Sequence, residues 1–263
     1  MAGAIVSGIT DHMSPNKPSD RYFTGIAVRT TGRDGAMAEV LDAIYGRTPA
    51  LFSFCNAATV NHAHASAEFR SVLKDMVLFN DGIGLDLASL LLYGSFFPAN
   101  LNGTDFIPLL FQAVDRPVSV YLLGGLPGVA ESAAQTIVGY NPHIRVVGTH
   151  HGYFTFGETP DIVADIVRQA PDLVLVGMGQ PRQEIWSHRV RNQIHAPLLC
   201  VGAFMDFASG RMPRAPRAVR MMRIEWVYRL ALEPRRLFRR YVGGAIPYFL
   251  RILAQRFRPG AGR

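Results

Sequence analysis

Short apolar runs alternate with segments of helical periodicity along most of the chain, and this order constrains the fold more than any other feature. Each run is rich in Val, Leu or Ile and is followed by a polar or glycine-containing turn. The order β-α-β-α predicts an α/β fold, in which helices cover both faces of a mostly parallel sheet. The runs are LFSFC (51–55), MVLFN (76–80), VSVYLLGG (118–125), IRVVG (144–148), LVLVGMG (173–179) and PLLCVGA (197–203).

The alternation stops near residue 208, where we expect a domain boundary. Residues 1–20 are polar and contain proline, so we expect them to be loosely ordered. Residues 21–208 are expected to form the α/β domain. Residues 209–263 are expected to form a basic helical appendage, with helices at about 218–232 and 235–255.

The sequence predicts neither a secretory signal nor a membrane span. The N-terminus lacks a charged start followed by a long apolar run. The longest apolar candidate, YVGGAIPYFL at 241–250, is shorter than the roughly 20 residues that a spanning helix needs. We therefore expect a cytoplasmic protein whose membrane contact, where it occurs, is at the surface.

Positive charge is concentrated in the expected appendage. Residues 211–263 contain 14 Arg and 2 acidic residues, a local charge of +12, whereas residues 1–210 contain 13 basic and 18 acidic residues, a charge of −5. A block of this kind attracts polyanions or anionic membrane surfaces. Alternatively, some of these arginines form only a solvated basic face.

Asp81 directly follows the MVLFN run. In parallel sheets, ligands bind beyond the carboxyl ends of the strands, so a carboxylate there can accept a proton from a substrate hydroxyl. The alternative is that Asp81 only caps the helix that begins near Ile83.

Glycines follow the VSVYLLGG run, and they suit a phosphate site. Gly124, Gly125 and Gly128 lie between a strand and a helix, so free backbone N–H groups and a helix N-terminus face one point. The spacing matches neither G-x-G-x-x-G nor a P-loop.

The LVLVGMG run ends in a similar turn. Gly179 is followed by Gln183 and Glu184, whose side chains suit the hydroxyls of a ribose or sugar. Alternatively, Glu184 complements the helix dipole and Trp186 packs inward. Asp206, which follows the last run, is either a binding residue or a structural acid.

We expect no metal ion and no cofactor. The paired histidines in HHGYF (150–154) have no third ligand at a convincing spacing, and no Asp-x-Asp follows a strand. Phosphate charge is then met by backbone dipoles and arginine. Cys55 and Cys200 lie in apolar runs, where we expect buried free thiols.

Taken in order, nine stretches resemble the WecG/TagA/CpsF family of bacterial glycosyltransferases. The resemblance covers roughly residues 22–242. The stretches are FCNAATVNHA with Asn56, NDGIG, LNGTDF, LLGGLPGVAESAA, VVGTHHGYF, GMGQPRQEIW, VGAFMDFASG, RAPR and EWVYRLALEPRRLFRRY.

The resemblance implies an inverting transfer from a UDP-sugar to a sugar on undecaprenyl diphosphate, at the inner face of the cytoplasmic membrane. It also implies a Rossmann-like domain with a C-terminal appendage that helps to form the active site. The expected partners are these two substrates and an anionic membrane surface, with self-association into a homo-oligomer also considered. We expect no nucleic acid.

The resemblance also assigns residues. It implies Asp81 as general base with Asn56 beside it, the Gln183–Glu184 pair in the site, and Arg229, Arg236 and Arg239 on the lipid diphosphate. Together with the strand-end interpretation, the expected substrate-binding residues are Gly82, Asn102, Thr104, Asp105, Gly124, Gly125, Gly128, His151, Tyr153, Gly179, Gln183, Glu184 and Asp206.

Two positions near the expected sugar pocket depart from the family pattern. Phe54 stands where many members have Thr, and Asn100 stands where many have Arg. The transferred sugar is therefore expected only as a hexose or an N-acetylhexosamine, in the synthesis of an exopolysaccharide or another envelope polysaccharide.

Two other functions were considered. A basic nucleic-acid-binding α/β protein would also carry a basic, aromatic-containing end, but the apolar residues throughout the appendage disfavour it. A nicotinamide-dependent oxidoreductase is disfavoured because no G-x-G-x-x-G with a later acid follows any run.

Overall fold

The computed structural model describes residues 20–215, 227–228, 230, 234 and 243–257. The strands are β1 (Asp20–Phe23), β2 (Ile26–Arg29), β3 (Leu51–Cys55), β4 (Val77–Asn80), β5 (Val118–Gly124), β6 (Ile144–His150), β7 (Leu173–Gly177) and β8 (Leu198–Cys200). The helices are α1 (Arg33–Tyr45), α2 (Ala57–Ala65), α3 (Ala67–Lys74), α4 (Ile83–Tyr93), α5 (Gly103–Gln112), α6 (Val129–Val138), α7 (Thr159–Gln169), α8 (Arg182–Val190), α9 (Phe204–Ala208) and α13 (Gly244–Arg256).

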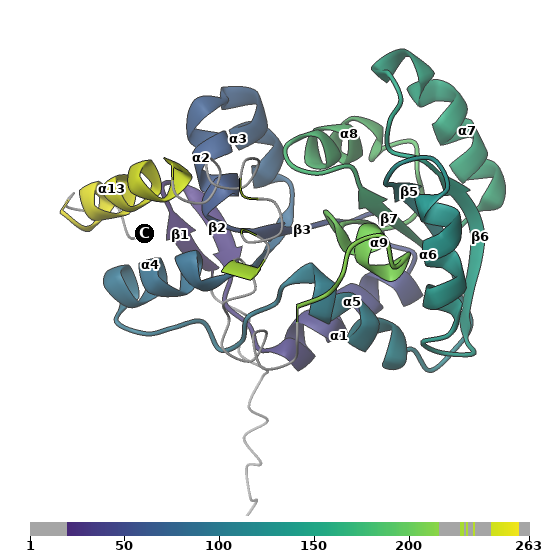
Figure 1. Ribbon diagram of the computed structural model, residues 1–263, viewed down its shortest axis with the longest axis horizontal. Coiled ribbons are helices and arrows are strands. Elements are labelled where there is room, and N and C mark those ends of the chain that lie inside the picture. Colours follow the sequence, from purple (N-terminus) through teal and green to yellow (C-terminus); the bar gives the residue numbers. More distant parts are fainter. Residues whose placement is uncertain (1–19, 216–226, 229, 231–233, 235–242, 258–263) are drawn as a thin grey trace, which may run out of the picture.

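One parallel sheet organises the molecule (Figure 1). Its six strands have the order β4-β3-β8-β7-β5-β6, and each begins in one of the predicted apolar runs, with β6 continuing two residues past its run. The prediction of an α/β, Rossmann-like fold is therefore confirmed. Because all six strands are parallel, the turns after them lie along one edge, which we call the carboxyl edge.

Both faces of the sheet are buried, which explains why the strands are apolar throughout. Along β5, Tyr121 and Leu123 face one core, whereas Val120 and Leu122 face the other. Helices α2, α3, α7 and α8 contribute to the first core, and α1, α5, α6 and α9 contribute to the second. This confirms the expected helical cover on both faces.

An antiparallel hairpin, which the apolar-run pattern did not predict, precedes the sheet. Strands β1 and β2 pair from Asp20 with Arg29 to Phe23 with Ile26. The two residues between them, Thr24 and Gly25, have positive φ angles of 50° and 86°, as two-residue hairpin turns require. Residues 1–20 were expected to be loosely ordered. Residues 1–19 lie outside the described residues, and Asp20 belongs to β1.

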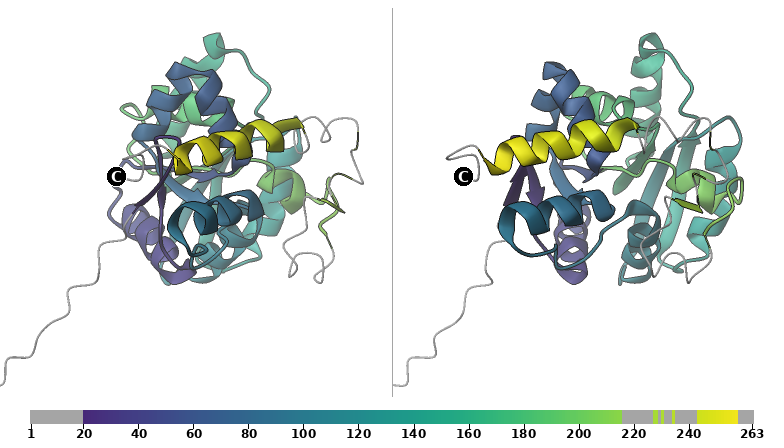
Figure 2. Two further views of the ribbon diagram at one scale, coloured as in Figure 1. Left: turned by 90° about the vertical axis from the view of Figure 1, so that its left-hand side faces the viewer. Right: turned by 60° about the vertical axis from the view of Figure 1, so that its left-hand side comes forward.

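Helix α13 packs on α2 and α4, two helices that begin at the carboxyl edge (Figure 2). Tyr248 is fully buried, and its hydroxyl donates to the Gly84 carbonyl at 3.1 Å. The Asn61 amide donates to the Gly244 carbonyl at 2.7 Å. The end of the expected appendage therefore lies against the helix that follows Asp81.

The expected appendage is described only in part. Of the helix predicted at 235–255, the described portion is helical from Gly244 to Arg256. Most of the helix predicted at 218–232 lies outside the described residues, and the boundary at 208 stays a prediction. Within the described ranges, no helix has the length and apolar character needed to cross a membrane.

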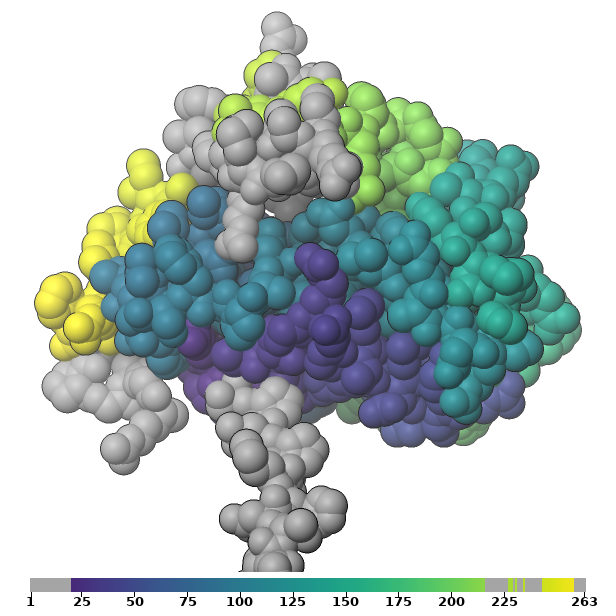
Figure 3. All heavy atoms as spheres, turned by 90° about the horizontal axis from the view of Figure 1, so that it is seen from below, coloured from purple at the N-terminus to yellow at the C-terminus, as the bar shows by residue number. Residues whose placement is uncertain are grey.

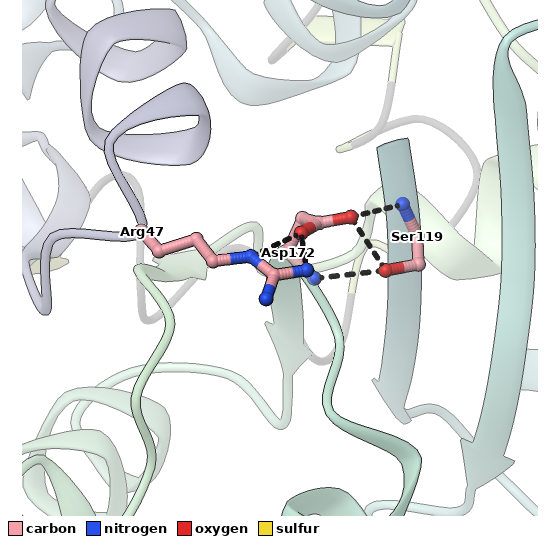
Figure 4. Close-up of polar contacts among 3 residues, drawn as sticks. All are labelled: Arg47, Ser119 and Asp172. Atoms are coloured by element: carbon pink, nitrogen blue, oxygen red, sulfur yellow. Dashed lines mark hydrogen bonds and ion pairs between the residues drawn. The ribbon is translucent and has the colours of Figure 1, made fainter. Parts of the chain in front are cut away.

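Asp172 joins three segments at the opposite, amino edge of the sheet (Figure 4). Its Oδ2 accepts from the Ser119 backbone N–H at 2.8 Å and from the Ser119 hydroxyl at 2.6 Å. Its Oδ1 accepts from the Arg47 guanidinium at 2.7 and 2.9 Å. Although burial acts in the opposite direction, these hydrogen bonds and the guanidinium charge lower the pKa of Asp172.

Candidate active site

Asn56 and Asp81, the two expected catalytic residues, are in contact at the carboxyl edge. Asn56 caps α2, where its Oδ1 accepts from the backbone N–H groups of Ala58 at 3.0 Å and Thr59 at 3.2 Å. The cap directs the amide nitrogen of Asn56 to Asp81, and Nδ2 donates to Oδ2 at 3.3 Å. A helix cap and an orienting contact are thus combined in one side chain.

The N-cap of α4 is Gly82, one residue after Asp81, and a glycine has no side chain with which to accept the helix N–H groups. The Gly82 N–H instead donates to Asn100 Oδ1 at 2.9 Å. Asn100, one of the two departures from the family pattern, therefore holds the turn that carries Asp81.

Phe54, the other departure, lies in the core. Its side chain is buried, and its ring packs against Phe79 and Phe106, with centroids 6.1 and 5.7 Å away. The structure thus places Phe54 beneath the carboxyl edge and not on the surface of the expected sugar pocket.

Gln180 is a residue of this edge that sequence reasoning missed. Its Nε2 donates to the Phe54 carbonyl at 2.8 Å, and its Oε1 accepts from the Thr59 hydroxyl at 3.0 Å. Thr59 Oγ1 also accepts from the Asn56 N–H at 3.0 Å. Gln180 therefore ties the turn after β7 to the cap that orients Asp81. Its place in the quoted GMGQPRQEIW stretch was the available signal.

Gln183 and Glu184 are buried, with exposed fractions of 2% and 0%. Sequence reasoning expected both to contact substrate, but the structure places their side chains behind the surface of the edge. Gln183 Oε1 accepts from the Gly202 N–H at 3.1 Å, which fixes the turn after β8. Trp186 is also fully buried, which confirms the alternative interpretation that it packs inward.

The glycine turns after β5 and β7 pack closely together. A Cβ at Gly124 would lie 2.3 Å from the Gly177 carbonyl oxygen, so only glycine fits between these strand ends. Gly128 is the N-cap of α6, and Gly179 accepts from the Gln183 N–H at 3.0 Å. The arrangement leaves a helix N-terminus at the carboxyl edge, as a phosphate site requires.

The loop after β6 joins the same region. The Gly152 N–H donates to the Gly125 carbonyl at 2.8 Å. His151 precedes this contact, and Tyr153 follows it with 66% of its surface exposed. The structure therefore brings His151 and Tyr153 beside the glycine turn after β5.

Asn102, Thr104 and Asp105 begin α5 and hold an arginine. Asn102 is the N-cap, and its Oδ1 accepts from the Asp105 N–H at 3.0 Å. Arg214 donates to the Thr104 carbonyl at 3.0 Å and to the Asp105 carboxylate. The Asp105 carboxylate therefore forms an ion pair with Arg214, the first arginine of the RAPR stretch.

Asp206 makes a similar pair, because its carboxylate lies 3.0 Å from the Arg211 guanidinium. Both acids therefore anchor the start of the basic segment at the carboxyl edge. Of the expected lipid-diphosphate residues, Arg229, Arg236 and Arg239 all lie outside the described residues.

The side chains that commonly bind metal ions are dispersed in the described part of the chain. Among the residues that the structure describes, no group of three or more His, Cys, Asp and Glu side chains is arranged to hold a metal ion. Cys55 and Cys200 are free and buried, as expected from their apolar runs. Burial raises the pKa of both thiols, which keeps them neutral.

In a comparison with known protein families, the model described as "Glycosyl transferase WecG/TagA/CpsF family" matches residues 21–262. The match includes the parallel sheet, α13 and all of the hairpin except Asp20.

Proposed function

The chain belongs to the WecG/TagA/CpsF family of glycosyl transferases, and we propose that it is an inverting enzyme that uses a UDP-sugar. The transferred group is a hexose or an N-acetylhexosamine. The acceptor is a sugar on undecaprenyl diphosphate, in the synthesis of an exopolysaccharide or another envelope polysaccharide. The contact between Asn56 and Asp81 at the carboxyl edge carries this proposal.

Asp81 acts as the general base. Its carboxylate takes the proton of the acceptor hydroxyl while that oxygen attacks the anomeric carbon, and UDP leaves from the opposite face of the sugar. Asn56 holds the carboxylate in one orientation through its 3.3 Å hydrogen bond. Since a carboxylate at a strand end lies where parallel sheets bind ligands, Asp81 is well placed for this step.

The donor diphosphate binds at the glycine turns after β5 and β7. There the N-terminus of α6 offers backbone N–H groups to the phosphate oxygens. Negative charge accumulates on the leaving UDP in the transition state, and fixed N–H dipoles stabilise it without rearranging. Guanidinium groups of the basic segment, which bind phosphate in bidentate fashion, complete the charge balance without a metal ion.

An apolar face beside the site supports contact with a membrane. We call it the α4–α13 face; Figure 3 shows the two helices side by side at one end of the molecule. Its exposed members are Ile83, Leu87, Leu90 and Leu91 of α4, Ile246, Leu250 and Leu253 of α13, and the adjoining Phe257. Exposed apolar side chains on two helices that pack together favour an interaction site there.

The charge distribution favours an anionic bilayer as the partner of this face. The chain between α9 and α13 carries most of the +12 charge of residues 211–263. Near an anionic leaflet, each basic residue contributes on the order of 1 kcal/mol to binding. The enzyme is therefore a peripheral protein of the inner face of the cell membrane, where Arg229, Arg236 and Arg239 hold the diphosphate of the lipid acceptor.

A ligand panel followed by an activity assay tests the proposal. UDP and one member of a set of UDP-sugars should raise the melting temperature, whereas NADH should not. The stabilising UDP-sugar, incubated with a synthetic prenyl diphosphate sugar, should yield an acceptor heavier by one sugar residue in mass spectrometry. Stabilisation by NADH alone, with no response to UDP, would contradict the proposal.

A further inference from the structure

Glu184 lies at the centre of a buried polar cluster behind the candidate active site. The cluster comprises Ser53 of β3, Gln183 and Glu184 of α8, and the Gly202 backbone. Glu184 Oε1 accepts two hydrogen bonds at 2.8 Å, one from the Ser53 hydroxyl and one from Gln183 Nε2. Both donors are uncharged and at most 2% exposed. Glu184 Oε2 has no hydrogen-bond partner among the described residues.

Such an environment disfavours a negative charge. Burial raises the pKa of Glu184, and hydrogen bonding by Gln183, Ser53, its own backbone and Gln180 offsets this only in part. The titratable groups that face it are the Cys55 and Cys200 thiols, whose pKa values burial also raises. Of the other charged groups on α8 and α3, His188 pairs with Asp75 and Arg189 with Glu68. The guanidinium groups of Arg182 and Arg70 donate to backbone carbonyls, that of Arg182 to Phe154 and that of Arg70 to Ala63 and His64.

The cluster determines which way the Gln183 amide points. Because Glu184 Oε1 accepts from Nε2, the amide oxygen of Gln183 must face the other way, where it accepts from the Gly202 N–H at 3.1 Å. Gly202 comes just before Ala203, which is the N-cap of α9. Helix α9 carries Asp206, whose carboxylate pairs with Arg211. One buried carboxyl is thus linked to the turn that anchors the basic segment.

We propose that Glu184 is a positioning residue, an uncharged carboxyl that fixes the Gln183 amide and, through it, the turn after β8 at the carboxyl edge. It does not contact substrate. This inference rests on the proposed function for its effect on catalysis, but its physical core, a neutral buried carboxyl that orders Gly202, is independent of that function.

The protonation of Glu184 has a measurable consequence for stability. An acid whose pKa is higher in the folded than in the unfolded protein contributes its full stabilisation only below its pKa in the unfolded protein, about 4.3 for Glu. This stabilisation is lost as pH rises through the pKa of the folded protein. Glu184→Gln preserves the Oε1 acceptor and cannot ionise. The melting temperature of Glu184→Gln minus that of the wild type should therefore increase from about pH 5 to pH 8.

Glu68→Gln is the matched control, because Glu68 is exposed on α3, where it pairs with Arg189 and not with a member of the cluster. Its melting-temperature difference from the wild type should stay constant over the same range. A Glu184→Gln difference as flat as that of Glu68→Gln would overturn the proposal, because Glu184 would then ionise normally.

The positioning role is tested by removing the acceptor. Glu184→Leu leaves the Gln183 amide without its partner, so hydrogen exchange in the peptide containing Gly202 should become faster, whereas Glu184→Gln should retain the wild-type rate. With the donor and acceptor established, Glu184→Leu should lower kcat at least tenfold with a smaller change in donor KM, and Glu184→Gln should restore most of the activity.

The outcomes separate the two proposals. Wild-type exchange at Gly202 together with wild-type kcat in a folded Glu184→Leu protein would overturn the positioning role. Absence of sugar transfer in every protein, with the predicted pH series and exchange rates intact, would overturn only the proposed function. The pH series needs only Glu184→Gln, so it decides the protonation state even where Glu184→Leu does not fold.

Discussion

The side-chain amide of Asn56 donates to the Asp81 carboxylate at 3.3 Å, although the two residues follow different strands. The same Asn56 side chain caps α2 through its oxygen. Because two backbone N–H groups hold the side-chain oxygen of Asn56, the amide nitrogen of Asn56 points the other way, toward Asp81. Helix capping at the end of β3 thereby orients the proposed base at the end of β4.

Substitutions at Asn56 should separate these two roles. Asn56→Ser preserves a good helix cap but removes the amide donor, so activity should fall at least tenfold with little change in melting temperature. Asn56→Ala removes both and should also destabilise the fold by about 1 kcal/mol. Activity and thermal unfolding of both variants check this.

Ser66 supplies the control, because it caps α3 by accepting from the Phe69 N–H at 3.1 Å and lies outside the site. Ser66→Ala should lower stability by about 1 kcal/mol and leave kcat unchanged. A fully active Asn56→Ser enzyme would show that Asn56 is only a cap.

The α4–α13 face should be required for membrane binding. Leu250→Asp places a charge on a residue with 61% of its surface exposed, so sedimentation with anionic liposomes should be strongly reduced while stabilisation by UDP persists. Val167→Asp, at an apolar residue of α7 that is 48% exposed, is the matched control and should sediment normally. Equal sedimentation of both variants, or tight salt-resistant binding to DNA or RNA in a gel shift, would contradict this assignment.

The proposed transfer should proceed without a divalent metal ion. Backbone N–H groups at α6 and arginine guanidinium groups supply the charge that a metal would otherwise supply. Initial rates should therefore be the same within about twofold in excess EDTA and in added Mg²⁺ or Mn²⁺. Loss of activity in EDTA that Mn²⁺ restores would show that a metal ion takes part.

Asp172 should stabilise the amino edge of the sheet in a pH-dependent manner. Asp172→Ala leaves the Ser119 N–H without its acceptor, so it should cost about 1–3 kcal/mol at pH 7. Because the folded pKa of Asp172 is lowered, its contribution is present above the unfolded pKa of about 3.9 and is lost as pH falls through the folded value. Urea unfolding of Asp172→Ala and the wild type at pH 7 and at about pH 3 measures this.

Asp42→Ala is the comparison for that series, since Asp42 is an exposed carboxylate of α1. Substitutions at exposed surface positions change stability little, so its unfolding midpoint should stay close to that of the wild type at both pH values. A pH-independent effect of Asp172→Ala would show that packing, and not the carboxylate charge, stabilises this edge.

The sequence was sufficient to predict the sheet and the position of Asp81, because two-sided burial makes parallel strands continuously apolar and ligands bind where such strands end. The hairpin was missed, since DRYF and IAVR are short and mixed in polarity; the signal was the Thr24–Gly25 turn between them. Local patterns identify long, uniformly apolar elements more readily than short elements of mixed polarity.

Side-chain burial at the site could not be predicted from the sequence. Gln183 and Glu184 follow a glycine turn like ligand-binding residues, yet both are buried, because α8 packs across β3, β7 and β8. Similarly, the contact of Tyr248 with Gly84 joins positions that are 164 residues apart. Such contacts depend on how the helices pack and leave no local periodic signal.

The most direct test of the central claim is the rate of sugar transfer by Asp81→Asn, measured with the matching UDP-sugar and prenyl diphosphate acceptor. Asp161→Asn, at an exposed residue of α7, is the control. We predict that Asp81→Asn lowers kcat by about 10²- to 10⁴-fold, with melting temperature and UDP binding unchanged, while Asp161→Asn matches the wild type. An Asp81→Asn enzyme that retains half of the wild-type rate would contradict the account, because another group would then remove the proton.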